Sequence, residues 1–544
     1  MKTYKKIIVS LLLASVFAGC SKDILDEDAP AIISADNLYK DKAGFDAGIN
    51  GLYDEVRRSR SGYTLNAVNS MMTGPAYIGT DNAYANYRDA TEDIYNLWGA
   101  INNPTVELFQ AEWAWLYETI NAANTIIKRA ENPAVNWTSD QKNLTLAEAR
   151  AIRAWCYRHL TYMWGDVPLT LEESSGSKIK TDWVRTPVAE VRAAMEADWL
   201  FAEEYLPVTS ELDGKMLKGV VQHYLAELYL AQGRNEEARD FALKVTTNSE
   251  YKLVTARYGV NATKPGTAFT DMFLNGNSNR SQQNTEALWV LQAELNVLGG
   301  EPHNVMRRYW VNRYYSFTLR GTDNVAKSPF IVSEEFGGRG IGRYGPTKWA
   351  LSIYPTGDDR GSDFAWRFSY TINNPNGVPK GRNLGDVVAL DRTSNEKTLN
   401  PNWPSTRKWD YASPIDPNVD RAYNDQIYLR SADTYLLLAE AYFKLSDLTN
   451  AAKAINELRK RAHAPEISEA DVTLDFILDE RSRELFSEEE RRYTLLRTGK
   501  FLERVRAHNV LAGPKVTERD LLYPIPQAVI DANLTLKMPN NKDY

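Results

Sequence analysis

Two pairs of helical segments with the same pattern of small and apolar residues occur about two hundred residues apart in this 544-residue chain. The first pair reads Leu-Ala-Glu-Leu-Tyr at 225–229 and continues to Ala238, and the second reads Leu-Ala-Glu-Ala-Tyr at 438–442 and continues to Ala451. The pairs align without a gap. Small side chains at fixed places let two helices approach closely across a short turn, so each pair predicts a helical hairpin.

These pairs resemble tetratricopeptide-type hairpins, so we expect a mainly α fold in which such hairpins form a right-handed scaffold. Apolar residues three or four apart support it, as in the stripe from Phe109 through Trp113 and Leu116 to Ile120. The same periodicity predicts helices over roughly 38–58, 106–131, 141–163, 188–206, 216–232, 235–247, 428–446, 449–463, 472–486 and 489–508.

The segment between the two hairpins, roughly 257–420, has a different composition. It holds 16 of the 31 glycines, together with many Asn and Pro residues, which argues against long helices. We therefore expect a loop-rich insertion of short strands and helices, flanked by an N-terminal helical region at 37–256 and a C-terminal one at 421–544. Loops on a rigid scaffold commonly carry binding sites, and we expect one at 60–105 as well.

Residues 1–19 have the form of a secretory signal, with three lysines before an apolar run of about eleven residues. That run is too short to span a bilayer, which takes about twenty residues. Gly19-Cys20 follows and resembles a bacterial lipobox, so we expect cleavage before Cys20 and its lipidation; the alternative is an ordinary signal that happens to precede a cysteine. The acidic stretch at 20–36 should be a flexible tether, and it resembles the surface-export signal of Bacteroidetes lipoproteins.

Charge and cysteine content exclude several classes of function. A formal charge of −7 argues against nucleic acid as a partner. Only Cys156 remains besides the predicted lipid cysteine, and we expect a buried, inert thiol. The five histidines form no ligand-spaced pair and no EF-hand pattern occurs, so we predict no cofactor and no metal site, apart from a possible structural calcium at loop acids such as Asp271 or Asp323.

Four further stretches occur, after the lipobox, in the order found in the SusD/RagB family of surface glycan-binding lipoproteins, which this chain resembles. They are E-A-R at 148–150 with G-D-V-P-L at 165–169, L-A-E-A at 438–441 with I-N-E-L-R at 455–459, I-L-D-E-R at 477–481 through Arg497, and Y-P-I-P at 523–526 with Asn533. Thr494 departs from the family, which usually has an acidic residue there. The resemblance implies one compact unit that covers a TonB-dependent, SusC-like outer-membrane transporter and is held to the outer membrane by its lipid, facing the cell exterior.

Several motif residues are charges on otherwise apolar helices. Arginine pairs with carboxylates bidentately and can fix how helices meet, so we interpret these charges as structural and not catalytic. They are Glu148, Arg150, Arg153, Glu480, Arg481, Arg483 and Glu484.

The loop before residue 106 carries the side chains that a sugar binder needs, which are flat aromatic platforms with polar groups at the edge. It contains Asp81, Asn82, Tyr84, Tyr87 and Trp98. In the family that the chain resembles, an aromatic residue from this part of the chain commonly stacks on the sugar. Trp98 is the best single candidate, although it could instead cap the helix stack.

A second cluster in the insertion contains Trp310, Arg313, Tyr314 and Tyr315. Aromatic side chains interleaved with arginine can stack and hydrogen-bond at once, and the family's other ligand residues usually come from this region. The same residues could form a strand with one buried face. Their basic and aromatic mixture also occurs in proteins that bind single-stranded nucleic acid, but the acidic chain and the predicted surface anchor argue against that ligand.

We therefore expect a non-catalytic protein that captures oligosaccharide at the cell surface and passes it to a transporter. Peptide capture is the first alternative, because some relatives are associated with peptide uptake. A glycoside hydrolase is less favoured: it needs two carboxylates about 5–10 Å apart across the substrate, and the acidic pairs Glu334-Glu335 and Asp358-Asp359 are adjacent in sequence. Nucleophile-elbow, zincin and phosphate-loop motifs are absent.

Overall fold

The structure is a computed structural model that describes residues 35–61, 72–86, 94–99, 102–174, 180–297, 299–300, 304–392, 401–419 and 421–544. The predicted signal peptide, Cys20 and Tyr87 lie outside these ranges. Within them, no helix is long and apolar enough to cross a membrane.

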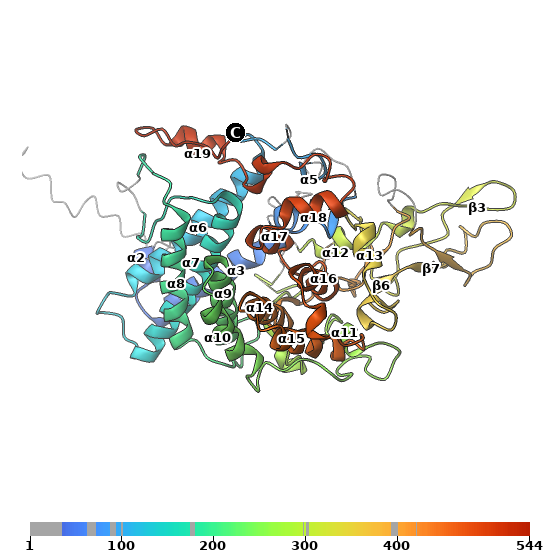
Figure 1. The fold of residues 1–544 in the computed structure, drawn as a ribbon, viewed down its shortest axis with the longest axis horizontal. Helices are drawn as coiled ribbons and strands as arrows, with labels where there is room; N and C mark the ends of the chain where they lie inside the picture. The colour runs from blue at the N-terminus through green and yellow to red at the C-terminus, as the bar shows by residue number, and fades with distance from the viewer. Residues whose placement is uncertain are drawn as a thin grey trace, which may run out of the picture.

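Long helices form the left and centre of the molecule in Figure 1, as the apolar periodicity predicts. The helices of the first half of the chain, long and short, are α2 (Ala35–Leu38), α3 (Lys42–Arg57), α4 (Thr73–Tyr77), α5 (Ile94–Leu97), α6 (Glu107–Arg129), α7 (Ser139–Trp164), α8 (Val188–Tyr205), α9 (Lys218–Gln232) and α10 (Asn235–Thr246). Those in the C-terminal part are α14 (Ser431–Lys444), α15 (Leu448–Arg461), α16 (Leu474–Leu485), α17 (Arg491–Arg497), α18 (Phe501–His508) and α19 (Gln527–Ala532).

The two hairpins predicted from the repeat are α9–α10 and α14–α15, and they are joined into one stack. Helix α7 packs on α8, α8 on α9, and α10 packs directly on α14 although the insertion separates them in sequence. The repeated small residues lie where these helices meet: Ala226, Ala238, Ala439 and Ala451 are all fully buried. The prediction of a helical scaffold interrupted by an insertion is therefore confirmed.

Local sequence signals set the ends of α7. Thr138 accepts a hydrogen bond from the backbone of Gln141, whose side chain accepts one from the Thr138 backbone, so a capping box begins the helix. Gly165 follows the last residue, with a φ of 72° that favours glycine. The G-D-V-P-L motif thus marks a helix end.

Two predicted helix bounds are wrong. Residues 489–508 form two helices, α17 and α18, because Gly499 adopts a φ of 70° and ends the first. Residues 428–430 belong to strand β10 (Gln426–Arg430), which pairs antiparallel with β2 (Ala287–Leu291) before α14 begins. All five residues of each strand are buried, and a short apolar run of this kind does not distinguish strand from helix.

The insertion consists of short elements, as its glycine content predicts; the part around β3 and β7 occupies the right end of Figure 1, and α11 lies at the bottom of the view. The helices are α11 (Ala268–Asp271), α12 (Met306–Trp310) and α13 (Lys348–Ser352). Its strands besides β2 are β3 (Leu319–Arg320), β4 (Ala326–Lys327), β5 (Tyr344–Pro346), β6 (Trp366–Arg367), β7 (Ser369–Thr371), β8 (Val387–Ala389) and β9 (Ser405–Thr406). One further strand, β1 (Ala83–Ala85), comes from the N-terminal region. They pair in twos: β1 with β5, β3 with β4, β6 with β9 and β7 with β8.

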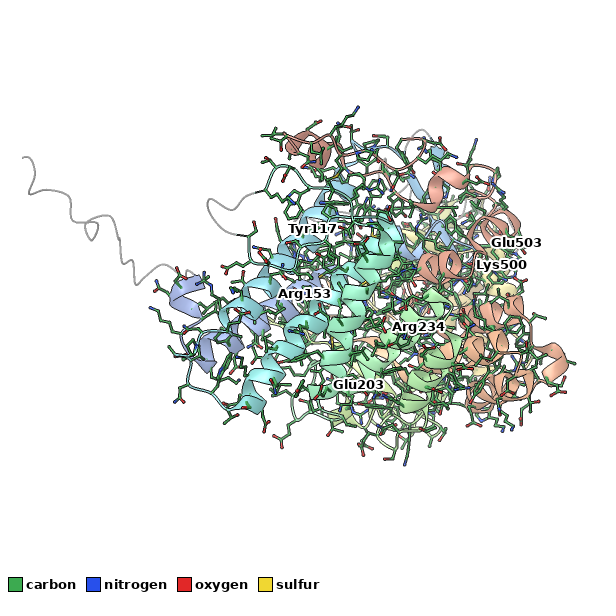
Figure 2. The ribbon with its side chains drawn as sticks, turned by 60° about the vertical axis from the view of Figure 1, so that its left-hand side comes forward. Tyr117, Arg153, Glu203, Arg234, Lys500 and Glu503 are labelled. Carbon is green, nitrogen blue, oxygen red and sulfur yellow. The ribbon has the colours of Figure 1, made fainter. Side chains whose placement is uncertain are left out.

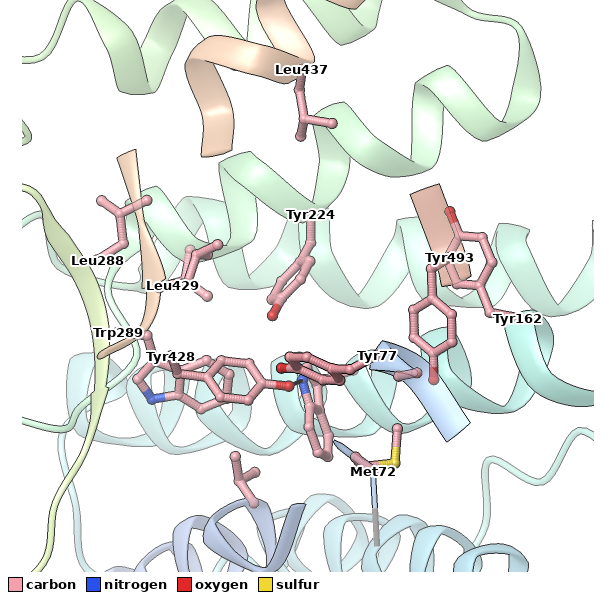
Figure 3. Close-up of a cluster of buried hydrophobic side chains, with 14 of the residues drawn as sticks. Met72, Tyr77, Tyr162, Tyr224, Leu288, Trp289, Tyr428, Leu429, Leu437 and Tyr493 are labelled. Atoms are coloured by element: carbon pink, nitrogen blue, oxygen red, sulfur yellow. Dashed lines mark hydrogen bonds between the residues drawn. The ribbon is translucent and has the colours of Figure 1, made fainter. Parts of the chain in front are cut away.

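Aromatic side chains fill much of the space between the scaffold and the insertion (Figure 3). Trp289 of β2 lies edge-on to Tyr428 of β10, with 5.0 Å between ring centroids, and Tyr162 of α7 stacks on Tyr493 of α17 at 4.7 Å. Such pairs add about 0.5–1.5 kcal/mol each beyond the area that they bury. Much of the aromatic content is therefore structural.

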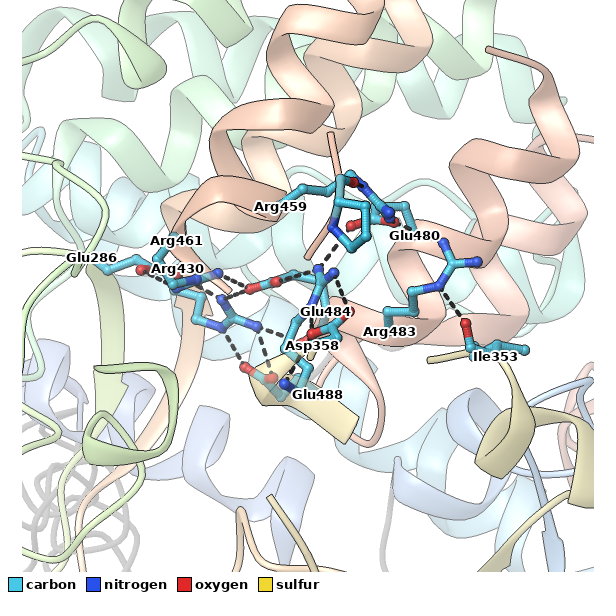
Figure 4. Close-up of polar contacts among 12 residues, drawn as sticks. Glu286, Ile353, Asp358, Arg430, Arg459, Arg461, Glu480, Arg483, Glu484 and Glu488 are labelled. Carbon is cyan, nitrogen blue, oxygen red and sulfur yellow. Dashed lines mark hydrogen bonds and ion pairs between the residues drawn. The ribbon is translucent and has the colours of Figure 1, made fainter. Parts of the chain in front are cut away.

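Buried ion pairs connect the C-terminal helices to the insertion (Figure 4). The Glu484 carboxylate accepts hydrogen bonds from Arg360, Arg430 and Arg461, all fully or almost fully buried. Their positive charges hold the pKa of Glu484 well below its usual value, against the opposing effect of burial. Glu480 likewise pairs with Arg459 and with Arg360.

The same arrangement occurs on the N-terminal helices (Figure 2), where Arg153 of α7 forms a bidentate pair with Asp198 of α8 at 2.8 Å for both bonds. Arg234, which is partly exposed, links the α9–α10 turn to Glu196 of α8. These contacts agree with the structural interpretation of the motif charges.

Candidate functional site

The structure brings the two predicted ligand clusters together. Strand β1, within the first cluster, pairs with β5, so that Ala85 lies opposite Tyr344. The Tyr344 ring in turn contacts Tyr309 and Trp310 of α12, with centroid distances of 4.6 and 5.4 Å. The described parts of the two segments, 77–86 and 304–315, therefore form one neighbourhood, although more than two hundred residues separate them.

Trp98 does not form an exposed platform in this structure, which corrects the first expectation. The side chain is 1% exposed. Its ring stacks on Tyr523 with centroids 6.2 Å apart and meets Phe501 edge-on at 6.1 Å, while the Arg492 guanidinium lies 5.4 Å from its centre. A ring enclosed by the C-terminal region offers no face to a sugar, so Trp98 is a core residue that caps the helix stack.

Asp81 is also structural. It is fully buried and accepts hydrogen bonds from Arg491 at 2.7 and 2.9 Å and from Arg504 at 2.7 Å. Burial raises the pKa of this carboxyl, but the two guanidinium groups outweigh it and hold the pKa well below the usual value. Its neighbours Asn82 and Tyr84 are 3% and 1% exposed, so the prediction that these three side chains reach a ligand is wrong for this structure.

Two residues of the second cluster are core residues as well. Trp310 is 2% exposed and meets Phe486 edge-on. Tyr314 is fully buried, stacks on Tyr370 at 4.8 Å and donates its hydroxyl hydrogen to the backbone oxygen of Gly338 at 2.8 Å. The sequence did not show that Tyr314 belongs to a second apolar core formed within the insertion.

Of the predicted ligand residues that the structure describes, Tyr315 and Arg313 are half-buried, and they lie on the surface of this neighbourhood. The Arg313 and Arg339 guanidinium groups lie 5.9 and 5.8 Å from the centre of the Tyr315 ring, and Arg339 Nε donates to the tyrosine hydroxyl at 3.4 Å. Arg339 is also fixed by a bond to the backbone oxygen of Asn418. We call Arg313, Tyr315 and Arg339 the Tyr315 surface; it presents an aromatic ring with two guanidinium groups close to it.

Of the two loop acids suggested as calcium ligands, one forms an ion pair and the other accepts a hydrogen bond from the backbone. Asp271 is buried and pairs with Arg257 at 2.5 Å, and Asp323 accepts from the backbone of Val325 in an exposed turn. No group of three or more His, Cys, Asp or Glu side chains suited to a metal ion gathers among the described residues.

A groove that the sequence did not indicate lies between α6 and the C-terminal segment around α19. It has a volume of about 480 Å³. Its aromatic lining residues are Trp113 and Tyr117 of α6 and Trp183 of the segment before α8. Trp183 lies outside every predicted amphipathic helix. A tryptophan that no predicted helix buries is a candidate for a ligand contact, and this is the one sequence signal that could have pointed to Trp183.

Comparisons with known proteins agree with this fold. The model of the SusD family matches residues 285–544, and a model described as "Starch-binding associating with outer membrane" matches residues 38–230. SusD-like protein P2 of Formosa agariphila is 27% identical over the whole of both chains, and SusD-like protein P25 of that organism is 24% identical over 93% of this chain and 92% of its own.

Solved structures share the same architecture. A SusD homologue from Bacteroides thetaiotaomicron superposes with a TM-score of 0.70 at 18% identity, covering 94% of this chain and 98% of its own. A laminarin-binding SusD-like protein superposes at 0.69 with 20% identity, covering 93% and 100%. Because the two family models together match residues 38–230 and 285–544, and the curated relative P2 aligns over the whole of both chains, this chain belongs to the SusD/RagB family.

Proposed function

We propose that this protein is a non-catalytic carbohydrate-binding protein of the outer cell surface, which captures an oligosaccharide and passes it to a partner TonB-dependent transporter. The observation that carries the proposal is the Tyr315 surface, at the place where the two predicted ligand loops meet. A half-buried ring suits the apolar C–H face of a sugar, and the two guanidinium groups close to it suit hydroxyl oxygens.

Relatives support the ligand class. One structural neighbour is described as laminarin-binding and another as a surface glycan-binding protein of Bacteroides fluxus. The description of the family model over residues 38–230 combines starch binding with association with the outer membrane. Because the structural neighbours share about a fifth of their residues with this chain, they do not indicate which glycan is bound.

The acidic pairs considered for a hydrolase support a non-catalytic role. Asp358 is buried and forms a bidentate pair with Arg360, so it is unavailable as a proton donor or nucleophile. Asp359 pairs with His463 at 2.8 Å. The remaining pair, Glu334 and Glu335, is exposed on a turn, whereas a glycosidase needs two carboxylates on opposite sides of the scissile bond.

Binding assays on the purified mature chain test the ligand class. We expect selective binding to one class of oligosaccharide on a glycan microarray, a Kd in the micromolar to millimolar range because an open platform excludes little water, and no products after prolonged incubation. Selective capture of peptides from a library instead would favour peptide uptake, and specific release of shorter oligosaccharides would show an enzyme.

The anchor and the partner need a test in cells. We expect Cys20→Ala to abolish labelling by a palmitate analogue and to release the protein from the outer membrane, whereas Cys156→Ala should leave both unchanged. Affinity purification of the lipidated protein should recover a TonB-dependent transporter; recovery of none would argue against the proposed partner.

A further inference from the structure

We propose that the groove between α6 and the C-terminal segment is a second carbohydrate-binding site, separate from the Tyr315 surface. The choice of carbohydrate as its ligand rests on the proposed function, whereas the groove itself is argued from its own geometry. We call it the Trp183 groove, after the residue that lines it from the segment before α8. Its volume of about 480 Å³ falls within the range of about 300–1,000 Å³ that is typical of ligand sites.

One wall of the Trp183 groove belongs to α6. Trp113 and Tyr117 occupy successive turns of the same helix face, with ring centroids 5.1 Å apart and planes inclined by 34°. Tyr117, visible at the upper end of the helices in Figure 2, donates its hydroxyl hydrogen to the backbone oxygen of Pro168 at 2.7 Å. Because its polar end is occupied by the protein, the half-buried Tyr117 ring is held in place as an apolar surface.

Trp183 contributes the second wall, and the C-terminal segment fixes its backbone. The Trp183 backbone N–H donates to Asn533 Oδ1 at 2.7 Å, and Asn533 Nδ2 donates to the Trp183 backbone oxygen at 2.8 Å. The Lys180 ammonium lies 4.7 Å from the centre of the Trp183 ring. Residues 181–183 and 533–535 are therefore held together, so little ordering is needed on binding.

The rim of the groove supplies hydrogen-bonding groups. Gln110 and Lys180 are exposed and line it, so an amide and an ammonium group lie beside the aromatic walls. Asn121 also lines it and is oriented by two bonds to the Ser174 backbone. Aromatic faces with polar donors and acceptors at their edge are the chemistry that a sugar ring requires, whereas a purely apolar ligand would leave the rim groups without a role.

An apolar protein segment is the competing occupant, because aliphatic residues are exposed nearby. Val184 and Leu534, which flank Trp183 and Asn533 in sequence, are 55% and 77% exposed. A protein partner would bury these side chains, whereas a sugar held between aromatic rings does not need them. Substitutions at Trp183 and at Leu534 therefore distinguish the two occupants.

The experiment uses the purified mature chain and six-unit malto-, laminari-, xylo- and manno-oligosaccharides as probes. Isothermal titration calorimetry is run on the wild type, Trp183→Ala, Trp183→Phe, Leu534→Asp, and the exposed-aromatic control Tyr205→Ala. Each is also made in a Tyr315→Ala/Arg339→Ala background, which isolates the groove. Hydrogen exchange with mass spectrometry follows peptides covering 110–121 and 180–184, and thermal unfolding checks that each variant is folded.

In the Tyr315→Ala/Arg339→Ala background we expect residual binding of one probe. Trp183→Ala should weaken this binding about tenfold, whereas Trp183→Phe should keep most of the affinity. Leu534→Asp and Tyr205→Ala should leave the affinity unchanged. The probe should also slow exchange at 110–121 and 180–184. Loss of all binding in that background, or bound probe without slower exchange at these peptides, overturns the groove while leaving the proposed function intact. Binding of no probe by the wild type overturns both for these glycan classes.

Discussion

Asp81 and Arg491, which lie 410 residues apart in the sequence, form a fully buried bidentate ion pair with N–O distances of 2.7 and 2.9 Å. Arg504 binds the same carboxylate from α18. These bonds attach the loop before β1 to the C-terminal helices. A residue that looked like a sugar ligand is thus part of the junction between the two ends of the chain.

Replacement of Asp81 by Asn should destabilise the protein by about 3–5 kcal/mol, because two buried guanidinium groups lose their counter-charge. The pKa of Asp81 is lower in the folded state than in the unfolded state. Its contribution to the free energy of unfolding is therefore present at a pH above the unfolded-state pKa and is lost as pH falls through the folded-state pKa. Urea unfolding at several pH values measures this. Equal stability of wild type and Asp81→Asn at pH 7 would contradict it.

Trp98→Ala should lower the free energy of unfolding by about 3–5 kcal/mol, because it leaves a cavity among Tyr523, Phe501 and Arg492. Denaturant unfolding gives this value, and Trp98→Phe should recover part of it. Glycan affinity of the still-folded variant should be close to wild type. A loss of affinity with unchanged stability would restore the original interpretation of Trp98 as a ligand platform.

Glu112 of α6 is fully buried, and neither carboxyl oxygen has a hydrogen-bond partner among the residues that the structure describes, so burial raises its pKa well above the usual value. Because this pKa is raised, the full free energy of unfolding is present at a pH below the unfolded-state pKa of about 4.3. Part of it is lost as pH rises toward the folded-state pKa. Glu112→Gln should therefore remove part of the decline in stability between pH 5 and pH 8 and stabilise the protein at pH 8 by about 1–3 kcal/mol. The neighbouring exposed Glu118→Gln is the matched control; the same change in both variants would refute this assignment.

Tyr315→Ala should weaken glycan binding about tenfold while changing the free energy of unfolding by less than about 1 kcal/mol, since the ring is half-buried at the surface. Tyr315→Phe separates the two contributions: it keeps the stacking face but loses the hydroxyl that Arg339 binds. Calorimetric titration with the glycan found by microarray gives the affinities. An unchanged Kd for Tyr315→Ala would remove this surface from the site.

Cys156 should not react with a thiol reagent in the native protein, because it is fully buried and burial raises its pKa well above the usual value. In a chain that begins after residue 20, one thiol should become reactive only in denaturant. Spectrophotometric titration with an aromatic disulfide measures this. Rapid labelling under native conditions would show that α7 opens locally.

The helical scaffold could be predicted in most of its detail from the sequence. Apolar periodicity is a local property, and it located α6 to α10 and α14 to α16 to within a few residues. The repeated alanines predicted two hairpins that now pack on each other as α10 and α14. The break at Gly499 was missed because a single glycine can also be accommodated within a helix, and only the surrounding packing decides.

The candidate site could be predicted only as a region. The sequence determined that aromatic and charged side chains are concentrated at 77–98 and 303–315, and the fold brings the described parts of these segments, 77–86 and 304–315, together through β1 and β5. Which of those side chains face solvent depends on tertiary partners: Arg491 for Asp81 and Tyr523 for Trp98 come from the far end of the chain, and Tyr370 for Tyr314 comes from the insertion itself.

The Trp183 groove arises in the same way, because it forms only where the C-terminal segment packs beside α6. Sequence patterns record the local preference of each segment, and tertiary structure alone decided which polar and aromatic groups are covered. The physical reason is that burial and ion pairing are set by residues outside each local segment, in the case of Asp81 and Arg491 by a partner 410 positions away.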